Sequence, residues 1–180
     1  MIIQGPMGLV ADRASGTKEA EWIGVETAQA ADIPKGALCA WDVAADNSAV
    51  AGILQNTWGL RVIVYPTAEA GDVADGKNRV AGVANKLIPG YAGFASGRSP
   101  ICLLQIYGHR SDLMADTDGN SNIIVGGIIQ PSGDAAGKFE GPQTETAVAL
   151  PADVLKVCGF SFEAVAVNTT TTFNGFLKIR

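Results

Sequence analysis

The chain has 180 residues, with 13 basic and 18 acidic side chains, so its formal net charge at pH 7 is −5. A content of 47 % hydrophobic and 17 % charged residues is too apolar for a disordered segment and predicts a folded core. The basic residues form no cluster, and phosphate neutralisation needs one, so we expect no nucleic-acid partner.

Two features bear on location. The longest apolar stretches, such as Leu60–Val64 and Ile123–Ile129, fall far short of the roughly 20 residues that a membrane-spanning helix needs. The chain starts with Met-Ile-Ile-Gln-Gly-Pro, which lacks the charged and apolar regions of a signal peptide. We therefore expect no membrane partner and synthesis in a cytoplasm.

Short apolar runs rich in Val, Ile and aromatics, punctuated by Gly and Pro, predict a mainly β fold with little helix, either a β-sandwich or a small β-barrel. In chain order, the expected strands are Trp22–Thr27, Ala37–Val43, Leu60–Tyr65, Arg79–Ala84, Ile101–Tyr107, Ile124–Gln130, Val157–Ala166 and Gly175–Ile179. Alternation is clearest over Cys158–Ala164 and Phe176–Ile179, where we expect one buried and one solvated face. A short helix is expected over Ala44–Asn56, and one turn after Pro151.

Three segments of the chain resemble three others further along, and such an internal repeat predicts two related β units. The matches pair Val80–Ala84 with Val157–Ser161, Leu104–Ile106 with Leu177–Ile179, and Pro34–Cys39 with Ile124–Ile129. We therefore expect a β-rich domain at residues 22–180 with an internal duplication, about 30–112 and 113–180.

Residues 1–21 differ from the rest of the chain. Met1–Val10 is apolar and broken by Gly and Pro, and Ala11–Glu21 is polar, so neither half makes a self-sufficient element. This N-terminal arm is expected either to fray or to add a strand to the sheet of another subunit.

Candidate catalytic residues are few. His109 is the single histidine, and a small hydrolase would have to use it with Asp112 or Asp116. The chain has no Gly-x-Ser-x-Gly elbow and no phosphate-binding glycine loop. Glu140, Glu145 and Glu163 have no local context that favours paired-carboxylate chemistry. We expect no catalytic residue and no cofactor.

Asp116, Asp118 and Asn120 alternate in the way that oxygen ligands of Ca²⁺ do. An EF-hand loop starting at Asp116 would need Gly at its sixth position and Glu at its twelfth, but Ser121 and Gly127 stand there. A looser cation loop stays open, although a polar turn between strands explains the same residues without metal.

The cysteines and tryptophans are scattered. Cys39, Cys102 and Cys158 lie far apart in apolar runs, which favours small buried hydrophobes with reduced thiols over disulfides or metal ligands. Trp41 is expected in the core, whereas Trp22 and Trp58 could line a sugar platform or a protein interface.

The order of these motifs resembles the capsid decoration, or cement, proteins of tailed bacteriophages. The segments that carry the resemblance are Pro34–Asp42, Val80–Ala84, Leu103–Arg110 and the terminal Phe176–Arg180, so it covers roughly residues 30–180. The resemblance implies a structural virion protein on the outer capsid surface, made in the host cytoplasm. Its implied partners are the major capsid protein, whose subunits it would bridge, and further copies of itself, as a homotrimer or, second, a dimer.

Within that function, we expect contacts from residues 1–21 and from the apolar loop between Asn85 and Pro100. The expected capsid or subunit interface residues are Trp22, Trp58, Leu87, Ile88, Tyr91 and Phe94. The alternatives are a carbohydrate-binding or adhesin module of a virion that uses the tryptophans, and the small hydrolase.

Overall fold

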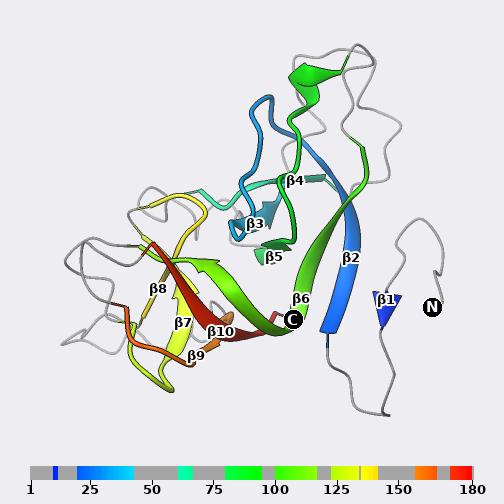
Figure 1. Ribbon diagram of the computed structural model, residues 1–180. Coiled ribbons are helices and arrows are strands. Elements are labelled where there is room, and N and C mark those ends of the chain that lie inside the picture. Colours follow the sequence, from blue (N-terminus) through cyan, green and yellow to red (C-terminus); the bar gives the residue numbers. More distant parts are fainter. Residues whose placement is uncertain are drawn as a thin grey trace.

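The computed structural model describes residues 10–11, 20–42, 61–66, 80–94, 100–116, 123–133, 135–141, 157–165 and 171–179. These residues confirm a mainly β fold, built as one ten-stranded sheet (Figure 1). The helical element described is the short turn η2 (Tyr91–Gly93). No helix in this part of the chain is long and apolar enough to cross a membrane.

The strands are β1 (Val10–Ala11), β2 (Ala20–Thr27), β3 (Leu38–Trp41), β4 (Arg61–Val64), β5 (Val80–Ala84), β6 (Cys102–Met114), β7 (Ile128–Pro131), β8 (Phe139–Glu140), β9 (Gly159–Ser161) and β10 (Thr172–Lys178). The predicted helix at 44–56 and the turn after Pro151 lie outside the described residues.

The first half of the sheet closes into a barrel. β2 pairs in parallel with β4, and β4, β3, β5 and β6 then follow as antiparallel neighbours. The first part of β6 pairs back onto β2, which completes a ring of five strands. The interior holds Val25, Ile33, Ala37, Cys39, Val62, Ala81, Ala84, Ile88 and Leu104. A five-stranded ring is narrow enough for side chains to fill it.

The second half closes in the same way. The later part of β6 pairs with β10, and β9, β7 and β8 follow as antiparallel neighbours. A parallel bridge between Ala115 and Phe139 completes this ring. Figure 1 shows the long β6 running from the first barrel into the second, where β10 lies along it. The interior includes Leu113, Ile123, Ile129, Cys158, Val165, Phe173 and Leu177.

The two barrels repeat the same turn before their second strand. The N–H of Gly36 donates to the carbonyl of Ala84 at 2.9 Å, and the N–H of Gly126 donates to the carbonyl of Ser161 at 2.8 Å. Both glycines have a positive φ, 82° and 73°, in the region that favours glycine. Residue 36 therefore corresponds to residue 126.

The closing contacts also repeat. The N–H of Ala28 donates to Val62 at 2.8 Å in the first barrel, and the N–H of Asp116 donates to Phe139 at 2.8 Å in the second. Each bond follows directly on a parallel pairing between the first and third strands of its barrel. The two units thus share one strand order, including its parallel step.

The structure sets the alignment of the last strands. Gly82 and Gly159, which the sequence pairs, both have φ 153°. However, the register places Gln105 opposite Val83 and Phe176 opposite Phe160, so Gln105 corresponds to Phe176. The sequence alignment of Leu104–Ile106 with Leu177–Ile179 is therefore wrong by two residues. A shift of two keeps every side chain on its face, so alternation alone cannot detect it.

Several expected strands have different bounds. Residues 124–127 form a turn, so β7 begins only at Ile128, and β9 is limited to three residues. β6 is longer than expected because it serves both barrels. The expected arm at 1–21 overlaps β2, which begins at Ala20, and β1 pairs with β2 of the same chain.

Candidate interaction surfaces

One outer face of the first barrel packs against the second barrel. Leu38 and Val83 point away from the interior of the first barrel and are fully buried in one cluster with Phe139 of the second. Backbone bonds fix the contact, because Leu38 N–H donates to Gly137 at 2.8 Å and Gly137 N–H donates to Tyr65 at 2.8 Å. The chain therefore contains a built interface between the two barrels.

The corresponding side of the second barrel faces solvent. Ile128 corresponds to Leu38 and is 42 % exposed, and Phe160 corresponds to Val83 and is 38 % exposed. Val157, two residues before β9, is also exposed. Equivalent apolar positions are thus buried in one barrel and open in the other.

Five rings form a chain of contacts with Phe160 at its centre, and we call them the aromatic row: Tyr107, His109, Phe160, Phe162 and Phe176. Ring centroids are 4.9 Å apart for Tyr107 and Phe176, 5.3 Å for Phe160 and Phe176, and 5.4 Å for Phe160 and Phe162. His109 stacks on Phe162 at 5.6 Å. The rings come from β6, β9 and β10 and from the residue after β9, so the sheet register creates the row.

The rings of the row pack against one another. Phe160 and Phe176 are nearly parallel, with planes 12° apart, and Phe160 meets Phe162 edge to face at 84°. Neighbouring rings therefore occupy each other's faces, as aromatic pairs prefer. The row still presents apolar surface to solvent, since Phe160 is 38 % and Phe162 is 47 % exposed.

A second exposed group lies in the loop at residues 85–94. Ile88 anchors this loop inside the first barrel, where it exchanges two backbone hydrogen bonds with Ile33, at 2.8 and 2.9 Å. The N–H of Gly90 donates to the Asp32 carboxylate at 2.8 Å, and the N–H of Tyr91 donates to Gln29 at 3.1 Å. The loop backbone is therefore held at several points.

Two large apolar side chains project from this fixed backbone. Leu87 is 55 % exposed and Phe94 is 36 % exposed, with Tyr91 partly buried between them in the chain. We call these three residues the loop surface. The N–H of Asn85 donates to Leu103 at 3.2 Å, and Leu103 is also exposed, so the start of the loop adjoins further apolar surface on β6.

Ile88 corrects one expectation. Its side chain is fully buried, so it is not available to a partner and acts as the anchor of the loop. Trp22 lies partly buried on β2 opposite Gln105, and Trp41 packs partly buried against the interior of the first barrel. Trp58 lies outside the described residues.

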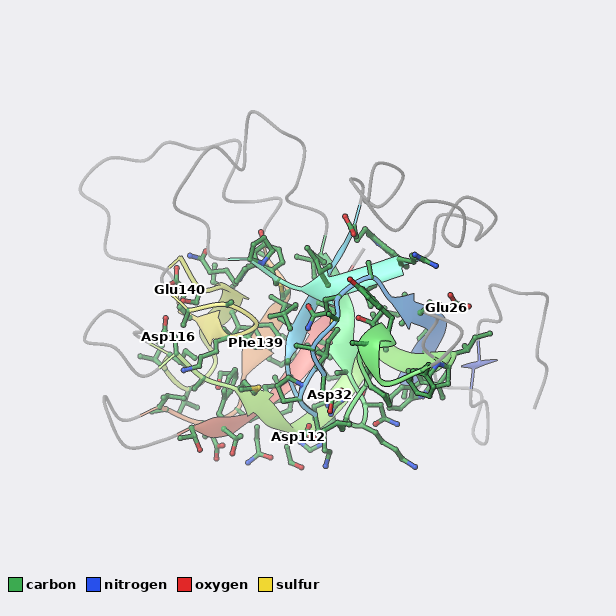
Figure 2. All side chains as sticks on the ribbon, turned by 90° about the horizontal axis from the view of Figure 1, so that it is seen from above. Glu26, Asp32, Asp112, Asp116, Phe139 and Glu140 are labelled. Atoms are coloured by element: carbon green, nitrogen blue, oxygen red, sulfur yellow. The ribbon has the colours of Figure 1, made fainter. Side chains whose placement is uncertain are left out.

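Asp116 has a structural partner. It is buried two residues after the end of β6, and its carboxylate accepts a hydrogen bond from the hydroxyl of Ser132. Figure 2 shows Asp116 together with Phe139 and Glu140 on the side of the second barrel, with Glu26 at the opposite end of the molecule. Asp118 and Asn120 lie outside the described residues. Within the described ranges, no three acidic, His or Cys side chains gather as metal ligands would.

The carboxylate of Asp112 is bound by two positively charged side chains. Arg110 binds its two carboxylate oxygens at 2.7 Å each, and Lys35 lies 3.0 Å away. Burial raises the pKa of Asp112, but hydrogen bonds and charge from Arg110 and Lys35 outweigh burial, so this pKa lies below its usual value. In the described part of the chain, no hydrogen bond joins His109 to Asp112 or Asp116.

The other candidate acids also serve the fold. Glu140 is buried and accepts hydrogen bonds from the amide of Gln130 at 3.0 Å and from the N–H of Gly133 at 3.1 Å. Glu163 accepts from the backbone and side-chain amides of Asn174 at 2.6 and 3.0 Å. Glu145 lies outside the described residues.

All three cysteines are free thiols. Burial raises the pKa of Cys39 to about 12 and also raises the pKa of Cys158 well above its ordinary value. Cys102 is partly buried, which raises the pKa of its thiol too. A raised pKa disfavours the reactive thiolate.

The sequence did not identify the aromatic row. The alternation over Cys158–Ala164 indicates a strand with one buried face, and the large rings are the natural candidates for that face. Instead, Cys158 and Ser161 are buried while Phe160 and Phe162 are exposed. The period of two is broken at Gly159, because Cys158 and Ser161 are three residues apart and both are buried. The sequence pattern therefore identified the strand, but neither this break nor the face that turns inward.

No protein family, curated protein or solved structure matches the chain.

Proposed function

We propose that this chain is a structural virion protein that binds the outer surface of a phage capsid and bridges subunits of the major capsid protein. The order of motifs along residues 30–180 resembles capsid decoration proteins. The observation that carries the proposal is the loop surface, where a backbone fixed by hydrogen bonds presents exposed apolar side chains.

A fixed loop favours binding because little conformational freedom is lost when a partner covers it. Ile88 and Gly90 hold the backbone before η2, and the N–H of Phe94 donates to the carbonyl of Tyr91 at 3.1 Å after it. Leu87 and Phe94 are therefore presented in place before contact. Ordering a free loop would instead cost about 1–2 kcal/mol for each residue whose backbone becomes fixed. The apolar side chains would bury themselves in depressions between capsid subunits.

Such binding would stabilise a shell by linkage. A protein that binds the assembled lattice and not the free subunits shifts the equilibrium toward the lattice, and many copies multiply the effect. The symmetry of a shell favours a homotrimer on local three-fold positions, with a dimer on two-fold positions as the second choice.

The test is co-sedimentation with purified capsids of the encoding phage, assembled without this chain. We expect the wild type to sediment with the capsids and to raise their thermal dissociation temperature. The double variant Leu87→Glu with Phe94→Glu should bind at least about tenfold more weakly, since two charges would be desolvated. Val125→Glu is the matched control, because Val125 is an exposed apolar residue in a turn of the second barrel.

Failure of the wild type to bind capsids contradicts the proposal. Equal losses for the double variant and for Val125→Glu would show that the loop surface has no special part in binding. The carbohydrate alternative depends on Trp22 and Trp58, of which Trp22 is partly buried and Trp58 lies outside the described residues.

A further inference from the structure

We draw no further inference here: the strongest candidate, the apolar surface patch of Ile128, Phe160 and Phe176 on the outer face of the second barrel, carries none because nothing in the described part of the structure shows what covers it.

Discussion

The two barrels have the same strand order, but the same outer face is buried in the first barrel and exposed in the second. Leu38 and Val83 are buried where Ile128 and Phe160 are exposed, although each pair holds the same place in its barrel. A single structural unit therefore carries a face that is core in one position and surface in the other. The difference shows that burial of this face depends on the neighbouring barrel and not on the strand itself.

The largest expected effect concerns the paired glycines Gly36 and Gly126. A Cβ at Gly36 would lie 1.9 Å from the carbonyl oxygen of Asp112, whereas a Cβ at Gly126 would meet nothing within 4 Å. We expect Gly36→Ala to lower the free energy of unfolding by about 3–5 kcal/mol, from positive φ and backbone overlap together. Gly126→Ala should cost about 1 kcal/mol, from positive φ alone.

Urea unfolding of the two alanine variants at one protein concentration measures this difference. Similar losses in both variants would mean that the Gly36 turn does not press against β6 as the structure shows.

A second comparison uses the outer faces directly. Leu38→Ala removes fully buried methyl groups and should cost about 2–5 kcal/mol in the free energy of unfolding. Ile128→Ala, at the equivalent exposed position, should cost less than about 1 kcal/mol when the chain is monomeric. Thermal unfolding at low concentration gives both values. Equal costs for both variants in the monomer would remove the distinction between the faces.

The smallest expected effect concerns pH. Arg110 and Lys35 hold the pKa of Asp112 below its unfolded value, so its stabilising contribution is present above about pH 4 and is lost as the pH falls through the folded-state pKa. Asp112→Asn should therefore lower stability at pH 7 by less than about 1 kcal/mol, because solvent screens this partly exposed group.

The pH dependence has a direct measurement. Denaturant unfolding at pH 7 and at about pH 2.5 should show the difference between Asp112→Asn and the wild type shrinking at the lower pH, where the wild-type carboxyl is also neutral. A difference that grows on acidification would have the wrong sign for a depressed pKa.

Part of the candidate interaction surfaces was predictable. Leu87 and Phe94 stand among glycines in a loop that is too apolar for a solvated connection, and the structure exposes both. Ile88 has the same apolar character, but its bonds to Ile33 turn it inward. Composition identifies such a loop, whereas the choice of anchor depends on backbone pairing with a segment more than fifty residues away in the chain.

By itself, the sequence determined the β class, the position of most strands and the turns that glycine permits, because these depend on local alternation and on single-residue backbone preferences. Only the tertiary structure decided that the strands close into two barrels, that β6 serves both, and that Phe160 and Phe176 face outward. An alternating strand has two faces of equal period. Which face is buried follows from the curvature of the closed sheet and from the barrel that packs beside it, and neither is a property of the strand alone.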